Sequence, residues 1–293
     1  MVFKMITQKL FKRLVKIFIL GFTFVFFNAN SSPIETKKQL LKIVVNAVKG
    51  EDPYFTLSKK ENFGATATQD FADKCSHEDL PTKHLTSLYD LTLKKEVFQV
   101  LSDSLDSDCV THNESRTRTE LKQDENSPLV VTKQGETTTW NFSMQLDPGF
   151  KATDGFTHLL QAKAENLNGE QEKQPRLRMS FYNRKGVPTL EFNRANDEGK
   201  FTTVAFVNAS QLVGKWLDVS LKTTWANKGK FEFIVTRHDN GKKVMYKKLS
   251  NVDLWNDSWG FMRFKVGIYR EYKSALTLKD VSVRFSDFEF AKE

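Results

Sequence analysis

The sequence predicts an all-β protein, an antiparallel sandwich of the jelly-roll type, with a short helical extension at its N-terminus. From about residue 93 onward, segments of strand length alternate apolar and polar residues, and no long helical pattern interrupts them. Turn sequences separate these segments, among them Asp-Pro-Gly at 147–149 and Asp-Asn-Gly at 239–241. Many short strands at regular spacing are typical of sandwiches and jelly rolls.

Residues 1–31 have the pattern of a signal peptide. Five cationic residues precede an uncharged apolar run at 17–27, and small and polar residues follow it. Ala29 and Ser31 form a small-x-small site, so we expect cleavage after Ser31. The apolar run is short for a membrane helix, which needs about 20 residues. We therefore expect a secreted protein, extracellular or, in a Gram-negative bacterium, periplasmic, without stable membrane association after signal removal.

The charge of the chain says little about its partners. The formal net charge is +8, but residues 1–31 hold five Lys or Arg and no acid, so +3 remains after them. A preference for a polyanion must therefore depend on where the cations lie. We expect a monomer with no nucleic acid partner.

Residues 32–92 are interpreted as an extension to a single β-domain at 93–293. Apolar residues at helical spacing predict a helix at 34–48, which Gly50 would cap. Residues 51–92 show no clear period and predict loops with a short helix or strand. Cys75 and Cys109 fit one disulfide in a secreted chain, and the absence of CxxC spacing argues against a zinc site.

The strands of the β-domain are predicted from alternation and from the turns between them. They are expected at 97–101, 117–122, 129–132, 137–146, 156–164, 176–182, 189–192, 201–207, 216–224, 230–237, 243–247, 262–269 and 281–290.

Four of these strands carry polar side chains in alternation, as the open face of a curved sheet needs if it lines a groove. In the last of the four, Met262, Phe264, Val266 and Ile268 would face the core. Strand by strand, the polar faces hold Arg116, Arg118, Glu120 and Lys122; Leu159, Gln161 and Lys163; Arg176, Arg178 and Ser180; and Arg263, Lys265, Gly267 and Tyr269.

This surface suits a polymer of uronic acids and its cleavage by β-elimination. Guanidinium groups bind carboxylates in bidentate fashion. The proton on C5 of the sugar is weakly acidic until the neighbouring carboxylate is neutralised, and Arg118 and Gln161 are suited to that task. Tyr269 is suited to remove the proton and to return one to the departing oxygen. Because tyrosine is mostly protonated near neutrality, Lys265 and Arg263 would be needed to favour the phenolate.

Four short motifs stand in order along residues 95–290. They are Arg118-Thr119-Glu120-Leu121-Lys122, after an acidic segment that ends at Cys109; His158-Leu159-Leu160-Gln161; Lys265 with Gly267-Ile268-Tyr269-Arg270; and Asp280, Arg284-Phe285 and Asp287-Phe288. In these motifs the chain resembles the jelly-roll polysaccharide lyases, most closely the glucuronan lyase family and more distantly alginate lyases of the same fold.

The resemblance implies a concanavalin A-like jelly roll and a secreted lyase that acts on an acidic polysaccharide without a cofactor. It implies catalytic roles for Tyr269, Gln161, Arg118, Lys265 and His158. Substrate contacts would come from Arg116, Glu120, Lys163, Arg176, Arg178 and Arg263. A structural calcium ion is compatible with a jelly roll, but no ligand set is legible in the sequence.

The sequence departs from the family pattern at two places. Phe264 and Val266 stand where the family often has Pro and Trp, and Lys163 stands where alginate lyases have a histidine. His158 is the nearest substitute for that histidine. Strict alternation puts His158 on the face opposite Gln161 unless a bulge intervenes.

Two other functions remain open from the sequence. A lectin-like jelly roll would hold an acidic polysaccharide without cleaving it, because fold does not fix function. A glycosidase would need two opposed carboxylates, and no such pair is legible. Arg116 and Arg118 could instead pair with Glu120, and Arg176 and Arg178 could be solvated surface. We assign no role to the histidines at 77, 84, 112 and 238.

Overall fold

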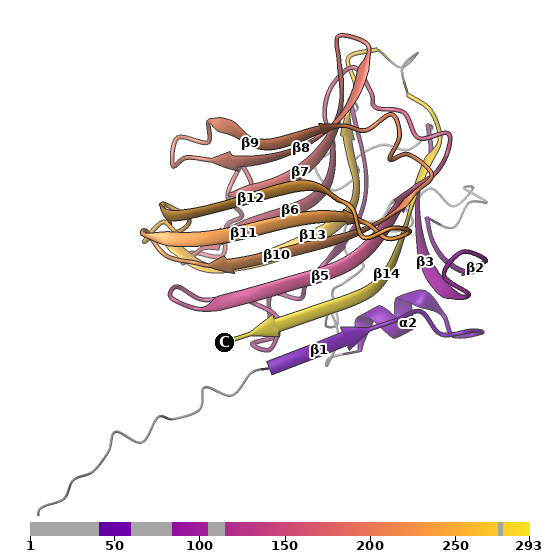
Figure 1. Ribbon diagram of the computed structural model, residues 1–293. Coiled ribbons are helices and arrows are strands. Elements are labelled where there is room, and N and C mark those ends of the chain that lie inside the picture. Colours follow the sequence, from indigo (N-terminus) through magenta and orange to yellow (C-terminus); the bar gives the residue numbers. More distant parts are fainter. Residues whose placement is uncertain (1–40, 60–83, 105–114, 275–277) are drawn as a thin grey trace, which may run out of the picture. The chain divides into compact units, whose positions relative to one another are not determined.

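The described part of the chain consists almost entirely of antiparallel strands in two sheets (Figure 1). The computed structural model describes residues 41–59, 84–104, 115–274 and 278–293. Among these residues the single helix is α2 (Pro53–Ser58), whose N-cap Asp52 accepts hydrogen bonds from the backbone N–H groups of Tyr54 and Phe55. The predicted all-β sandwich is confirmed.

The larger sheet has eight strands, and the first two of them in the chain lie before residue 93. In spatial order it contains β12 (Lys243–Val252), β11 (Gly229–Arg237), β10 (Trp216–Thr224), β5 (Thr137–Leu146), β14 (Val281–Lys292), β3 (Lys95–Ser102) and β2 (Leu85–Asp90), with β1 (Leu41–Val45) also paired to β14.

The smaller sheet has six strands and carries the polar faces expected to line a groove. Its spatial order is β4 (Arg116–Lys122), β13 (Trp259–Glu271), β6 (Thr157–Asn166), β7 (Leu177–Arg184), β8 (Val187–Ala195) and β9 (Phe201–Asn208). The strand that stands last of the four in sequence, β13, therefore lies between the first two, β4 and β6.

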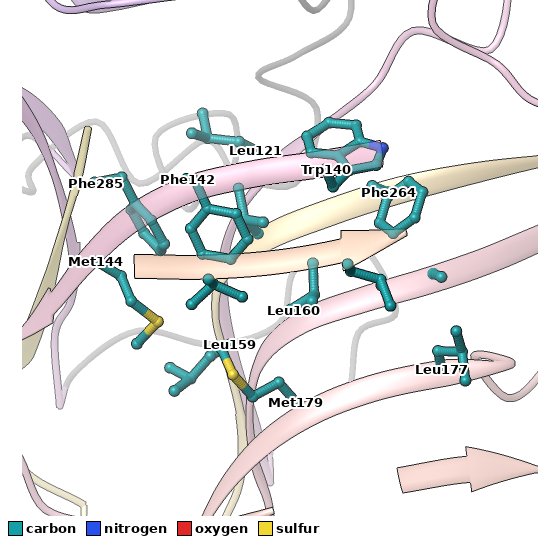
Figure 2. Packing of buried hydrophobic residues seen from close by; sticks show 14 of the residues in the cluster. Leu121, Trp140, Phe142, Met144, Leu159, Leu160, Leu177, Met179, Phe264 and Phe285 are labelled. Carbon is teal, nitrogen blue, oxygen red and sulfur yellow. The ribbon is translucent and has the colours of Figure 1, made fainter. Parts of the chain in front are cut away.

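The two sheets bury a shared apolar core (Figure 2). The ring of Trp140 on β5 lies 4.6 Å from that of Phe264 on β13, and Phe192 of β8 stacks on Phe233 of β11 at 3.8 Å. These contacts join one sheet to the other. Because successive side chains of a strand point to opposite faces, the polar residues of the smaller sheet are directed away from this core.

The predicted helix at 34–48 is wrong for its described part. Residues 41–45 form β1, which pairs with Phe288–Lys292 of β14, beyond the part of β14 that β3 reaches. The β-branched run Ile43, Val44 and Val45 favours a strand, and its alternating burial has the period of a strand. In this segment, pairing with the backbone of β14 therefore outweighs the helical spacing of the apolar residues.

The predicted strand at 129–132 is also wrong. The N–H groups of Val130 and Val131 both donate to the carbonyl of Ser127, so the segment turns, and only Thr132 forms a bridge, with Met262. The predicted signal peptide and both cysteines, Cys75 and Cys109, lie outside the described residues. Within the described ranges, no helix is long and apolar enough to cross a membrane.

Candidate active site

The site is organised around β13, which is hydrogen-bonded to β4 on one side and to β6 on the other. Its predicted alternation is confirmed, because Met262, Phe264, Val266 and Ile268 are all buried in the core. The opposite face forms two rows across the sheet. The first row holds Arg118, Tyr269, His158 and Ser180, and the second holds Lys122, Lys265, Gln161 and Arg178.

Two irregularities of strand register bring His158 onto the same face as Gln161. β13 has one more residue than β6 between the pairs Tyr269–His158 and Val266–Leu160, and β6 has one more residue than β7 next to His158. The core therefore takes both Leu159 and Leu160. The expectation that Leu159 shares the face of Gln161 is wrong, and the bulge on which the position of His158 depended is present.

The backbone at the irregular part of β13 requires a glycine, Gly267. Its φ is +146°, and a Cβ atom there would lie 2.3 Å from the carbonyl oxygen of Thr119. The glycine therefore permits the close approach of β4. It also leaves space above β13, where the side chains of Glu120 and Gln161 meet from the two neighbouring strands.

A surface cavity of about 580 Å³ covers this face, and we refer to it as the active-site cavity. Five cationic residues and one carboxylate line it, so its charge is strongly positive. The lining consists of Arg116, Arg118, Phe156, His158, Gln161, Lys163, Lys173, Gln174, Pro175, Arg178, Gly199, Phe201, Tyr269 and Glu271. The lining residues at 173–175 and Gly199 come from the segments before β7 and β9, and Phe201 is the first residue of β9. They were not identified from the sequence, because nothing local marks them as lining.

Tyr269 lies between two arginines of β4. Arg116 donates a hydrogen bond of 3.0 Å from Nη1 to the phenolic oxygen, and the guanidinium of Arg118 lies 3.9 Å from the centre of the ring. Arg116 is itself paired with Glu271 at 2.9 Å. Burial alone would lower the pKa of Arg116, but Glu271 and Tyr269 together raise that pKa above its ordinary value, so the group stays charged.

A buried carboxylate, Glu120, lies on this face among the cations. It is fully buried, and its Oε1 accepts a hydrogen bond of 2.5 Å from Nε2 of Gln161. Arg118 Nε and Lys265 Nζ each lie 4.0 Å from its Oε2. Glu120 was expected to contact the substrate and Lys265 to act on Tyr269, but neither residue lines the cavity.

His158 is held as a neutral imidazole. Its ring stacks on Phe156 at 4.2 Å, its Nδ1 lies 2.8 Å from Oγ of Ser180, and its Nε2 lies 3.3 Å from Nη1 of Arg178. An arginine only donates, so Nε2 accepts and Nδ1 carries the proton. Burial, together with Arg178 and Arg118, lowers the pKa of His158 well below its usual value.

Two of the expected substrate contacts lie elsewhere. Arg263 is fully buried between Glu125 and Glu165, with Nη2 3.1 Å from the carboxylate of Glu165. Arg176 is 2% exposed and pairs with Asp197, beside a neighbouring cavity. Neither arginine is solvated surface, and neither lines the active-site cavity.

Lys163 and Arg178 do lie in the cavity, as expected. The guanidinium of Arg178 lies 3.4 Å from the centre of the Phe201 ring, which fixes its position over the sheet. The described residues contain no group of three or more His, Cys, Asp or Glu side chains placed to hold a metal ion.

A comparison with known families identifies the family of this chain. A family profile described as polysaccharide lyase matches residues 66–287. The chain belongs to the polysaccharide lyase family. The prediction of a lyase is thereby confirmed, and no curated protein sequence matches the chain.

Solved polysaccharide lyase structures have the same fold. The endo-β-1,4-glucuronan lyase from the fungus Trichoderma reesei is 15% identical, with 70% of this chain and 85% of that chain covered and a TM-score of 0.50. A marine alginate lyase from Aplysia kurodai is 10% identical, with 84% and 97% covered and a TM-score of 0.54. At such identities the likeness shows the jelly-roll fold, which confirms that prediction.

The burial of neutral His158 predicts a loss of stability in acid. The unfolded histidine takes up a proton near pH 6.5 and the folded one does not, so its contribution is complete above that pH and is lost as the pH falls below it. The free energy of unfolding should fall by up to about 1.4 kcal/mol per pH unit on this account.

Urea unfolding between about pH 7 and pH 5 measures this effect, since it follows the stability on both sides of the histidine's ordinary pKa. His158→Gln should lose stability less steeply than wild type as the pH falls. Parallel curves for wild type and His158→Gln would rule out a buried neutral histidine at this position.

Proposed function

We propose that the protein cleaves a uronate-containing polysaccharide, such as a glucuronan-like polymer, by β-elimination. The observation that supports this most is the set of Arg118, Gln161 and Tyr269 around one strongly cationic cavity. The names of the similar structures, a glucuronan lyase and alginate lyases, point to the same substrate class. An extracellular acidic polymer is a suitable substrate for the secreted monomer that the sequence predicts.

The uronate carboxylate would bind between Arg118 and Gln161. Gln161 donates one amide N–H to Glu120. This hydrogen bond orients the second N–H of the amide for the substrate. Two donors on the carboxylate stabilise the negative charge that develops when the C5 proton leaves. The electron pair then forms the C4–C5 double bond and expels the glycosidic oxygen, which takes a proton.

Tyr269 would supply both proton transfers, first as base and then as acid. The cations beside it are Arg116, which donates to the phenolic oxygen, and Arg118, which lies against the ring. Negative charge that develops on this oxygen would lie next to the guanidinium of Arg116. Lys265 instead lies near the buried Glu120. We therefore assign to Arg116 the role at Tyr269 that the sequence alternation had assigned to Lys265.

His158 is assigned to positioning Arg178. Its Nε2 faces a guanidinium and its surroundings disfavour a second proton, so it is a poor acceptor for the substrate proton. With Ser180 on its other nitrogen, the ring is fixed in one tautomer. Arg178 and Lys163 would then contact carboxylates on sugars next to the cleaved bond.

A panel of acidic polymers tests the proposed reaction. Glucuronan, alginate, pectic and heparin-type polymers should include at least one that yields a product absorbing in the ultraviolet, from the double bond conjugated to the carboxylate. Tyr269→Phe should lower that rate by about a hundredfold or more, the usual size of an acid–base contribution, with binding retained. Binding of polymers without any such product would favour a lectin instead.

The role of Arg116 is tested by measuring kcat and KM separately. Arg116, Arg118, Phe156 and His158 lie against Tyr269, and Arg116 donates a hydrogen bond to its oxygen. Arg116→Gln should lower kcat by about tenfold or more with little change in KM, because the guanidinium that holds the phenolic oxygen during proton transfer is lost.

Two variants serve as controls for Arg116. Arg116→Lys should keep most of the wild-type kcat, since it keeps the charge. Lys163→Gln, which removes another cation of the same cavity, should raise KM and leave kcat nearly unchanged. Equal losses of kcat for Arg116→Gln and Lys163→Gln would mean that the arginine acts only through general charge.

A further inference from the structure

A second cavity continues the active-site cavity along β6. It has a volume of about 480 Å³ and shares Lys173, Gln174 and Gly199 with the active-site cavity. We refer to it as the end cavity. It reaches Asn166, five residues beyond Gln161, which is about 16 Å along a strand. A polymer bound at Gln161 and running in this direction would therefore enter it with a unit some way from the cleaved bond.

The charge of the end cavity is opposite to that of the active-site cavity. Four carboxylates and two cations line it, together with five side-chain amides. The carboxylates are Glu170, Glu172, Asp197 and Glu198, the cations are Lys173 and Arg176, and the amides are Asn166, Gln171, Gln174, Asn196 and Asn256. Carboxylates and amides offer the acceptors and donors that sugar hydroxyl groups need.

Neither cation makes the end cavity suited to a uronate. Arg176 is 2% exposed, and its guanidinium binds Asp197 and the carbonyl of Ala195. The same hydrogen bond lowers the pKa of Asp197 below its usual range, so this carboxylate stays charged. Lys173 lies at the boundary and belongs to both cavities.

We propose that the end cavity binds an uncharged sugar, so that the substrate is a mixed polysaccharide in which neutral units stand among uronates. The inference rests on the proposed β-elimination and specifies its substrate class. A uronate carboxylate in the end cavity would lie among like charges, whose repulsion at a solvated surface weakens binding by about fivefold. A neutral sugar meets no such repulsion, and its hydroxyl groups can still bind the carboxylates and amides of the end cavity.

The test compares kcat/KM on two classes of polymer, pure polyuronates and polymers that combine uronates with neutral sugars. Wild type should prefer the mixed class. The double variant Glu170→Gln, Glu198→Gln removes two exposed carboxylates of the end cavity, so it should fold normally. Its rate on pure polyuronates should rise by about fivefold, and the gain should shrink at high salt.

Asp239→Asn is the matched control, because it removes an exposed carboxylate of the larger sheet's hairpin between β11 and β12. It should leave both rates unchanged. A wild-type preference for pure polyuronates, or a double variant no different from the control, overturns the neutral-sugar inference while product formation upholds the lyase. Absence of unsaturated product from every polymer overturns the lyase, and the inference with it.

Discussion

The hydrogen bond between Gln161 and the buried carboxylate of Glu120 is the interaction on which the site depends. Glu120 lies opposite Gly267, and the missing side chain there lets the two groups meet above β13. Removing a charge from water is costly unless it is compensated, and here Arg118 and Lys265 lie 4.0 Å away from the carboxylate. One buried acid thus orients the amide and offsets the repulsion between neighbouring cations.

The register of the smaller sheet adds a second constraint. An extra residue in β13 relative to β6, and another in β6 relative to β7, turn His158 to the side of Gln161. The same change sends Leu159 and Leu160 together into the core, whose packing then holds the irregularity in place. The geometry of the candidate site and the packing of the core therefore depend on the same few residues.

The sequence predicts the parts of this site that follow from one strand alone. The alternation of β13 was sufficient to place Tyr269 opposite the core, and the arginine strand β4 was identified in the same way. Arg263 and Arg176 could not be excluded from the cavity by alternation, because their partners Glu125 and Asp197 come from other segments. For the same reason the sequence gives no sign that Arg116, rather than Lys265, approaches the phenolic oxygen.

The position of a bound uronate tests the account most directly. A structure of the Tyr269→Phe variant with a uronate oligosaccharide should show one carboxylate bonded to both Arg118 and the second amide N–H of Gln161. The C5 hydrogen of that sugar should point at the ring of residue 269. A carboxylate held only by Arg178 and Lys173, with no sugar near Arg118 and Gln161, would contradict the central claim.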